Sequence, residues 1–501
     1  MSSPRRLSSF ADISGAAQRP PYDPARHGHG IVHLGIGAFH RAHQACYTDA
    51  ALAAAGGDWR IIGASLRSVE LADALNPQNG LYTLIERGAS GVRARVIGSI
   101  ARVIAASREP ADLMASLVDA RTRIVAMTVS EKAYGIDRAT MTVDARHPGI
   151  AADLRTPANP SGVLGLLTEA LRRRRIAHLE PFTVLCCDNL PDNGEFVRHG
   201  VTDFARRLDP ALSDWIAESV FFPSCMVDRI TPASTEETRK DALRLTGCVD
   251  LAPVETEPFT QWVIDDRFPG GRPAWEAGGA LFVDNVRPYE AMKLRMLNGA
   301  HSMLAYAGFV SGRRYVRDTV GPEGFSSLIK RHFKAAASTL PRLPGIDLSA
   351  YARELLARFA NPAIAHETYQ IAMDGTEKLP QRIFAPALEA LEQGNDIRPF
   401  AFTVAAWMRY CTGRLDDGTR YSLRDPREEE IGRLLSGAVA PSDVTAALQA
   451  LPSFFPERLR NDPVWQGMVN SCLARMMSEG VHAALAEEKA VADADGWLVD
   501  Q

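Results

Sequence analysis

The sequence has no excess of charge of one sign and no long hydrophobic run. Its 501 residues hold 56 Lys and Arg against 60 Asp and Glu, a formal net charge of −4. Composition therefore offers no basic surface for nucleic acid or for an anionic membrane. No stretch approaches the ~18 apolar residues that a membrane-spanning helix needs. The stretch 1–21 has basic residues but no apolar core after them, which does not fit a secretory signal.

Grouped cysteines and metal-binding patterns are also lacking. The seven cysteines are an odd number, and no pair has C-x-x-C spacing, which argues against a disulfide framework and for a reducing compartment. The twelve histidines form no H-E-x-x-H motif. We therefore expect no metal ion, although a catalytic zinc assembled from distant residues stays an open alternative. Hydrophobic residues at 46% and charged residues at 23% are typical of a folded globular protein. These features predict a soluble cytoplasmic enzyme.

The first half of the chain predicts a doubly wound α/β domain. Residues 1–28 hold several prolines and suggest a loosely ordered N-terminal arm. The apolar run 30–34 then leads into the turn Gly35-Ile36-Gly37, a helix-forming stretch and a second apolar run at 59–64. Further strand-like runs follow, and a helix is expected over 162–175. This alternation predicts a parallel sheet within a domain spanning 29–287. The further expected strands cover 92–97, 122–129 and 182–187.

The second half of the chain has a different sequence pattern, because the alternation of β-branched and polar residues that is typical of strands almost disappears after Pro288. Helical periodicity dominates instead, so we predict a mostly α-helical second domain over 288–495. The expected helices cover 289–306, 323–338, 350–359, 385–393, 399–412, 426–436, 444–451 and 465–488.

The turn Gly35-x-Gly37 lies where the pyrophosphate of a dinucleotide would meet the start of a helix. The third glycine of the usual fingerprint is absent, since His40 stands there. A plain strand-to-helix connection explains the turn about as well. The ribose would be read after the second strand, where a carboxylate favours NAD and an arginine admits NADP. Glu70 and Arg67 both stand in that stretch, so the residues leave both cofactors open.

A polar face on the predicted helix after Pro288 is the most informative feature. With Lys293 at 0° and ideal α-helical geometry, Glu290 falls at roughly 60° and His301 at roughly 80°. Asn298 falls at roughly 140°, so all four share one broad face. Oxidation of an alcohol needs a base, and lysine serves if burial lowers its pKa from about 10.4. Asparagine can hold the oxygen and histidine can orient the substrate. The alternative is an ordinary solvated helix face.

A second polar segment, residues 187–194, follows a strand that we expect to be buried. Ligands of open α/β sheets bind beyond the carboxyl ends of the strands, which makes Asn189 a candidate site residue. The alternative is turn chemistry, since Asp, Asn, Pro and Gly are common turn formers. That alternative accounts well for Asn193 and Gly194, and less well for Asn189.

Five ordered segments resemble the mannitol dehydrogenase family, the long-chain polyol-specific dehydrogenases and reductases. They are 31–45, 185–194, 226–233, 257–268 and 293–308. The resemblance implies an N-terminal Rossmann-type domain, a helical C-terminal domain, NAD as cofactor and no metal. It also implies roles for the polar helix face: Lys293 as general base, Asn298 as an oxyanion donor and His301 as the group that orients the substrate. Asn189 is implied as the second oxyanion donor.

The resemblance extends to further site residues. It implies that Glu290 serves proton passage and that Asp228 lies near the substrate. It implies cofactor contacts from the segment 35–40, and it aligns Glu70 with the residue that reads the ribose, which favours NAD. Val69, however, stands where relatives often carry a polar residue, so NADP stays an alternative. The cofactor-binding candidates are Gly35, Gly37, Phe39, His40, Arg67 and Glu70.

The substrate is predicted from the segment 370–382, which resembles the fructuronate reductase branch of the family. Arg382 or Lys378 would bind a carboxylate, which arginine can do bidentately. We therefore hypothesise D-fructuronate and D-mannonate as the preferred pair. D-fructose with D-mannitol, or another polyol such as arabinitol, is the alternative, and Arg382 would then be a surface residue.

Other classes of function stay open. A zinc-dependent polyol dehydrogenase is one alternative, and a catalytically silent dinucleotide-binding sensor is another. We expect a small-molecule partner only, with no nucleic acid and no membrane. The oligomeric state is open, with a monomer as one option.

Overall fold

The computed structural model describes residues 4–89, 91–138, 140–321 and 325–494. The chain divides between Arg287 and Pro288 into two compact units, residues 1–287 and 288–501. Positions 1–3 of the expected arm, 323–324 of one expected helix and 495 of the expected second domain lie outside the described residues. Within the described part of the chain, no helix combines the length and the apolar character that crossing a membrane requires.

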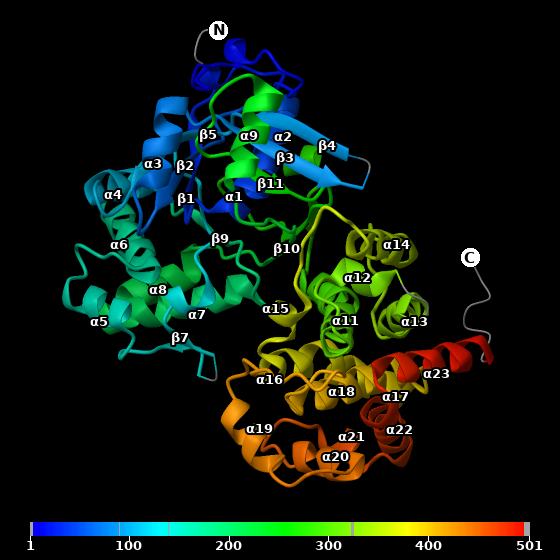
Figure 1. Cartoon of the computed structure of the whole chain (residues 1–501). Helices are drawn as coiled ribbons and strands as arrows, with labels where there is room; N and C mark the ends of the chain where they lie inside the picture. Colours follow the sequence, from blue (N-terminus) through cyan, green and yellow to red (C-terminus); the bar gives the residue numbers. More distant parts are fainter. Residues whose placement is uncertain (1–3, 90, 139, 322–324, 495–501) are drawn as a thin grey trace. The chain divides into compact units, whose positions relative to one another are not determined.

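A five-stranded parallel sheet organises the first unit, and it confirms the predicted α/β fold (Figure 1). The strand order is β5-β2-β1-β6-β9, with β1 in the centre between β2 and β6. Nearly all of its residues are buried, as expected for a parallel sheet covered on both faces. Because the strand order reverses between β1 and β6, their carboxyl ends form the position where sheets of this kind bind ligands. The strands are β1 (His29–Leu34), β2 (Arg60–Ser65), β5 (Ile100–Ala105), β6 (Ile124–Met127) and β9 (Thr183–Cys186).

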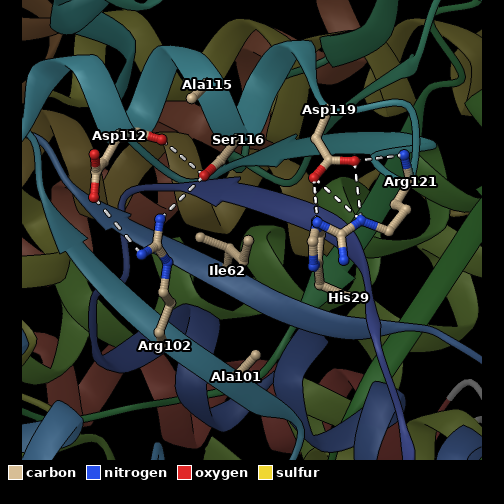
Figure 2. A pocket seen from close by; sticks show the side chains of 9 residues that line it. All are labelled: His29, Ile62, Ala101, Arg102, Asp112, Ala115, Ser116, Asp119 and Arg121. Atoms are coloured by element: carbon tan, nitrogen blue, oxygen red, sulfur yellow. Dashed lines mark hydrogen bonds and ion pairs between the residues drawn. The ribbon is translucent and has the colours of Figure 1, made fainter.

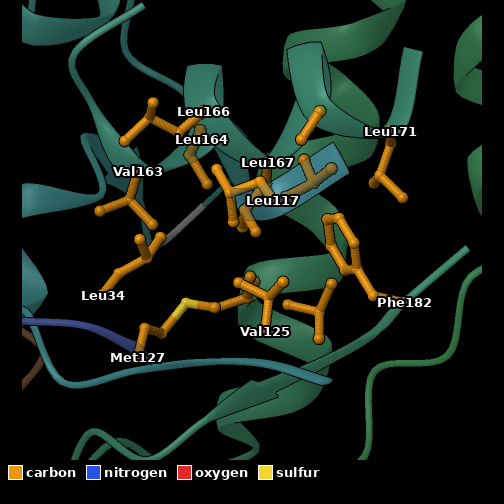
Figure 3. Packing of buried hydrophobic residues seen from close by; sticks show 14 of the residues in the cluster. Leu34, Leu117, Val125, Met127, Val163, Leu164, Leu166, Leu167, Leu171 and Phe182 are labelled. Carbon is orange, nitrogen blue, oxygen red and sulfur yellow. The ribbon is translucent and has the colours of Figure 1, made fainter. Parts of the chain in front are cut away.

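Alternate residues of the strands supply two different cores. Leu34, Val125 and Met127 pack against the helices on one face of the sheet, among them α6 (Val163–Ile176), as Figure 3 shows. Ile31, Ile124 and Ala126 point to the other face and join a second cluster. This is the two-residue period expected of a strand that is buried on both sides.

The remaining strands form three smaller sheets in the same unit. The expected strand 92–97 is present as β4, but it pairs antiparallel with β3 and lies outside the parallel sheet. β10 pairs antiparallel with β12, which in turn pairs with β13. These strands are β3 (Tyr82–Gly88), β4 (Gly91–Ile97), β7 (Ile136–Asp137), β8 (Thr142–Val143), β10 (Cys225–Asp228), β11 (Val254–Thr256), β12 (Gln261–Asp265) and β13 (Leu281–Val283). The remaining helices of this unit are α1 (Ala38–Ala42), α2 (Gln44–Ala55), α3 (Glu70–Leu75), α4 (Pro110–Val118), α5 (Pro148–Arg155), α7 (Asn193–Leu208), α8 (Pro210–Ser219) and α9 (Glu236–Thr246).

The segment before β1, where we expected a loosely ordered arm, packs against the rest of the unit over its described residues. Leu7, Ile13 and Ala17 are buried in a small apolar cluster with Cys248. The backbone N–H of Leu7 donates to the carbonyl of Val249 at 3.0 Å. Apolar residues spaced along this proline-containing segment anchor it, although its helical structure is limited to two short 3₁₀ helices, Phe10–Asp12 and Pro24–Arg26.

The second unit is helical over its described residues, as predicted. At its centre α18 is buried on all sides from Pro399 to Cys411, and it packs against α11 and α22. Most of its residues are apolar, and its buried Arg409 is paired with Asp416 at 3.0 Å. The helices are α10 (Arg287–Met292), which begins at the last residue of the first unit, α11 (Gly299–Val310), α12 (Val316–Val320), α13 (Phe325–Ser338), α14 (Leu348–Phe359), α15 (Thr368–Ala372), α16 (Gly375–Leu379), α17 (Ala385–Gln393), α18 (Arg398–Cys411), α19 (Glu428–Leu434), α20 (Pro441–Gln449), α21 (Glu457–Asn461), α22 (Pro463–Glu479) and α23 (Val481–Ala494).

Two of the expected helices are interrupted. The helix expected over 465–488 breaks at Gly480, whose φ of +85° ends α22 and starts α23. The helix expected over 289–306 passes through a π-helical segment, Lys293–Asn298, between α10 and α11. A second π-helical segment, Pro380–Phe384, lies between α16 and α17.

Candidate functional site

The two glycines of the turn after β1 have different roles. Gly35 has a φ of +93°, and a Cβ added there would lie 2.1 Å from the carbonyl oxygen of Thr128. The backbone itself therefore requires glycine at this position. Gly37 has an ordinary φ of −73°, and a Cβ added there would meet no atom within 4 Å. Neither the backbone conformation nor the packing around position 37 requires a glycine there.

We expect Gly37→Ala and Gly35→Ala to separate cofactor binding from folding. Gly37→Ala should fold like the wild type and weaken NADH binding, because the added methyl occupies the space in front of the turn. Gly35→Ala should lower the thermal midpoint or prevent folding, because its methyl clashes with the Thr128 carbonyl. NADH titration by fluorescence, together with thermal unfolding, measures both. Unchanged NADH affinity in folded Gly37→Ala would contradict a phosphate at this turn.

Histidines pack beneath the turn. His40 is fully buried, and its ring stacks on that of His33 with centroids 3.6 Å apart. The His33 ring nitrogens lie 2.6 Å from Gln44 Oε1 and 2.9 Å from Thr128 Oγ1. Burial lowers the pKa of His33 to about 3 and holds the pKa of His40 well below its usual range. Both rings are therefore neutral, and any contact of His40 with a cofactor would come from its backbone. Phe39 is half-buried and stacks on His43.

The two candidate ribose readers follow β2 and are exposed. Glu70 is the first residue of α3, and hydrogen bonds from the backbone there and from Ser68 lower its pKa. The carboxylate of Glu70 is therefore ionised at neutral pH, as acceptance of a ribose hydroxyl hydrogen bond requires. Arg67 lies three residues earlier in the same exposed stretch.

Asn189 is exposed at the tip of a tight turn after β9. The N–H of Leu190 donates to the carbonyl of Asp188 at 2.9 Å, which closes a three-residue turn around Asn189. Asn193 is fully buried, and its amide donates to the Asp188 carbonyl at 3.0 Å and to the Cys225 carbonyl at 2.8 Å. Asn193 thus ties this turn to β10, which agrees with the structural interpretation of Asn193.

Asp228 is the last residue of β10 and is buried. The neighbouring Arg229 is held by Glu86 at 2.6 Å and by the carbonyls of Ala42 and Glu257. The Glu257 carboxylate in turn accepts the N–H of Ile230 at 2.7 Å. Hydrogen bonds next to Asp228 therefore connect two of the segments that carry the family resemblance, 226–233 and 257–268.

In the second unit the π-helical segment changes the geometry predicted for the polar helix face. The N–H of Gly299 donates to the carbonyl of Leu294, five residues earlier. Such a turn contains more residues than the 3.6 of an α-helix. Residues five apart, such as Lys293 and Asn298, therefore lie closer around the axis than ideal α-helical geometry predicts. Lys293 is only 6% exposed and His301 only 8%, so the face is not a solvated one. Glu290 and Asn298 are half-buried.

Distant residues support the π-helical segment. His332 is fully buried, and its Nε2 lies 2.9 Å from the carbonyl oxygen of Arg295, to which the neutral ring donates. Burial lowers the pKa of His332 to about 4. The Arg295 guanidinium binds both oxygens of Glu389 at 2.6 and 2.7 Å. Gly299 allows the close approach, because a Cβ there would lie 2.6 Å from His332 Nε2.

His301 lies among aromatic and basic side chains. Its ring centroid is 4.6 Å from that of Phe359 and 5.3 Å from that of His366. Burial, followed by the charges of His366, Arg358, Arg382 and Lys293, holds the pKa of His301 well below its usual range. Sequence reasoning missed His366 and Arg358. They come from the segment before α15 and from α14, and no motif or spacing marked them.

Arg382 and Lys378, the proposed carboxylate ligands, have different environments. Arg382 is half-buried, with Nη1 3.3 Å from Oγ of Ser302, the residue next to His301. Lys378 donates to the carbonyls of Ile371 and Met373. Burial lowers the pKa of both side chains. Arg382 is thus near the polar helix face, while Lys378 stabilises the chain around the end of α15.

A separate cavity of about 410 Å³ lies at the amino ends of β1 and β5, away from the glycine turn (Figure 2). Its polar side chains pair with one another. Arg102 lies 3.7 Å from Asp112, and Asp119 binds both Arg121 at 2.6 Å and His29 at 3.4 Å. None of the candidate site residues lines it.

The parallel sheet, its strand order and the glycine turn are typical of a Rossmann-type dinucleotide-binding domain, and the comparisons identify the family. Residues 29–277 match the Mannitol dehydrogenase Rossmann domain, and residues 285–493 match the Mannitol dehydrogenase C-terminal domain. The chain belongs to the mannitol dehydrogenase family, as the sequence resemblance predicted, and is an oxidoreductase of that family.

Three similar proteins illustrate the range of the family. An uncharacterized oxidoreductase of Escherichia coli, YeiQ, is 42% identical over 93% of this chain and 96% of its own. D-mannonate oxidoreductase of Escherichia coli is 38% identical over 96% of this chain and 100% of its own. The solved structure of Pseudomonas fluorescens mannitol 2-dehydrogenase, a ternary complex with NAD and D-mannitol, is 36% identical. The match covers 96% of this chain and 99% of the Pseudomonas fluorescens chain, with a TM-score of 0.80.

Proposed function

We propose that the protein is an NAD-dependent oxidoreductase that acts at C2 of an open-chain sugar derivative, with D-fructuronate and D-mannonate as the preferred pair. The observation that carries the choice of substrate is the position of Arg382, whose Nη1 lies 3.3 Å from Oγ of Ser302, the residue next to His301. Arg382 also acts electrostatically on the buried His301 ring. A guanidinium at this position can bind a hexuronate carboxylate through two hydrogen bonds, whereas the neutral end of a hexitol needs no charged partner. The name of one relative, D-mannonate oxidoreductase, agrees with this choice.

Each candidate residue has a defined task in this proposal. NAD(H), when bound, supplies or accepts the hydride. Lys293 takes the hydroxyl proton in oxidation and returns it in reduction, with Glu290 serving proton passage. Asn298 and Asn189 donate hydrogen bonds to the substrate oxygen. His301 is neutral, so one ring nitrogen donates and the other accepts a hydrogen bond, which orients the substrate.

The cofactor and the remaining substrate contacts follow the same logic. The open space at Gly37 fits a phosphate, and the ionised Glu70 fits the unmodified ribose of NAD. Asp228 is proposed to contact substrate hydroxyls. Arg382 is proposed to bind the carboxylate, and Lys378 to hold the backbone nearby. D-mannitol with D-fructose is the second candidate pair, because the solved relative binds D-mannitol.

The proposal predicts a substrate preference that depends on Arg382. NADH oxidation should show a higher kcat/KM with D-fructuronate than with D-fructose, and NADPH should be a poorer cofactor. Arg382→Ala should reduce the preference for the acid at least ~10-fold, the scale of a charge-assisted hydrogen bond. Absorbance assays with both sugars and both cofactors measure this.

Arg458→Ala is the matched control, since Arg458 belongs to an exposed ion pair with Glu392 in the same unit. It should leave the preference unchanged. A preference for fructose in the wild type would return the protein to the mannitol dehydrogenase alternative. NADH binding without turnover on any hexonate or hexitol would favour a silent sensor instead.

A further inference from the structure

The loop after β6 contains a strained residue. Ser130 has a φ of +83° and a ψ of 147°, a backbone conformation that is essentially restricted to glycine. Its N–H donates to Oδ1 of Asp188 at 3.2 Å. The N–H of Val129 lies 3.1 and 3.2 Å from the two oxygens of the same carboxylate. Strain of this kind persists only where neighbouring contacts hold it, and here Asp188 supplies them.

The same carboxylate holds the other end of the loop. Tyr134 is fully buried, and its hydroxyl donates to Oδ2 of Asp188 at 2.6 Å. The loop 129–134 is therefore attached at both ends to one side chain. Hydrogen bonds that backbone N–H groups and a phenol donate to a carboxylate are stronger than those between neutral groups, so they hold the loop firmly.

Asp188 also begins the turn that presents Asn189. Its carbonyl accepts hydrogen bonds from Leu190 and Asn193, which close the turn and tie it to β10. The side chain of Asp188 thus fixes the loop after β6, while its backbone fixes the turn after β9. On the other side, Thr128 Oγ1 donates to the Gly35 carbonyl at 2.8 Å. The loop therefore lies beside the glycine turn, at the carboxyl ends of β1 and β6.

We propose that Asp188 is a positioning residue that holds loop 129–134 and the Asn189 turn in register. The inference rests on the proposed function, in which the cofactor binds at the carboxyl ends of β1 and β6 and Asn189 holds the substrate oxygen. The Asp188 carboxylate is engaged by Val129, Ser130 and Tyr134. It acts through Ser130 on the cofactor side and through Asn189 on the substrate side. In this way it fixes the distance and orientation between the nicotinamide that donates the hydride and the substrate carbonyl that accepts it.

Asp188→Ala tests this with three measurements: kcat with D-fructuronate, the Kd for NADH by fluorescence titration, and the thermal midpoint. We expect kcat to fall about 10²-fold, the scale of a displacement of about 1 Å at a reacting centre. The Kd for NADH should rise several-fold, and the midpoint should fall. Asp49→Ala is the matched control. The Asp49 carboxylate accepts the Tyr22 hydroxyl at 2.6 Å and the Gly98 N–H at 2.8 Å, toward the opposite edge of the sheet. It should lower the midpoint and leave kcat and Kd unchanged.

Adding Ser130→Gly to Asp188→Ala separates positioning from stability. Glycine adopts the φ of position 130 without strain, so the double variant should recover the part of the thermal midpoint that strain at position 130 costs, although the hydrogen bonds to Asp188 stay lost. Its kcat should stay low, because the Asn189 turn is still detached from the loop. Recovery of kcat together with the midpoint would overturn the proposal. So would a kcat for Asp188→Ala no lower than that of Asp49→Ala.

Asn189→Ala distinguishes failure of this inference from failure of the proposed function. Loss of an oxyanion donor costs about 10²-fold or more in kcat. If Asn189→Ala keeps the wild-type kcat, the proposed role of Asn189 is wrong, and the NADH Kd of Asp188→Ala still decides whether Asp188 holds the loop. If Asn189→Ala loses activity and Asp188→Ala does not, the inference alone is wrong.

Discussion

Lys293→Ala is expected to lower kcat by at least ~10², the usual contribution of a general base. The Kd for NADH should change little, because the cofactor candidates all belong to residues 35–70. The physical reason is burial. Lys293 is 6% exposed and lies close enough to His301 to act on its ring, so bulk water has little access to replace the lysine as a base. Stopped-flow hydride transfer and NADH titration measure the two quantities separately.

Lys293→Arg separates the base from the charge. Arginine keeps the positive charge but does not give up its proton at working pH. If Lys293 acts as a base, this variant should be nearly as impaired as Lys293→Ala. If the lysine only attracts an anionic substrate, the arginine variant should keep most of its kcat. Lys330→Ala, at an exposed position of α13, is the control and should behave like the wild type.

The fold was predictable because its signals are local. Buried strands such as β1 and β9 are short apolar runs, and the turn after β1 contains the glycine that its φ requires. The position of β4 was not predictable in the same way. Its alternating pattern specifies a half-exposed strand but not its partner, and it pairs antiparallel with β3 rather than joining the main sheet.

Motifs and the family resemblance nominated the candidate site residues, but the sequence did not predict the geometry of the helix that carries four of them. Ideal helix angles place Lys293 and Asn298 well apart, whereas the π-helical segment brings them closer. His332 and Glu389 stabilise that segment, and both lie tens of residues away along the chain. Gly299 leaves room for His332 to approach, a role that a single glycine in a helical stretch does not announce. Arg358 and His366 escaped prediction for the same reason, since only the folded chain brings them to His301.

Acidification should unfold the protein through its buried histidines, in a window that their pKa values define. Burial lowers the pKa of His332 to about 4 and that of His33 to about 3. Above about pH 6.5 these histidines are neutral in both the folded and the unfolded chain, so they do not change the free energy of unfolding. As the pH falls below about 6.5, the unfolded chain binds protons that the folded chain cannot. Each histidine then costs about 1.4 kcal/mol per pH unit until its folded pKa is reached.

The total effect is large compared with the stability of a typical protein. Between about pH 6.5 and 4, His332 and His33 each remove on the order of 3 kcal/mol from a free energy of unfolding that is usually 5–15 kcal/mol. His40 and His301, whose pKa values are also lowered, act in the same direction. Urea unfolding at constant ionic strength between about pH 7.5 and 4.5 measures the slope before most carboxylates titrate.

His332→Gln is the variant that isolates one histidine. Glutamine retains a donor for the Arg295 carbonyl but does not titrate, so the slope of the free energy of unfolding should fall by about 1.4 kcal/mol per pH unit. At neutral pH the variant should lose little stability if its amide reaches the carbonyl. An unchanged slope would mean that His332 is protonated in the folded protein. The donor to the Arg295 carbonyl would then be an imidazolium, and the π-helical segment that carries Lys293 would be held by a charge rather than by a neutral ring.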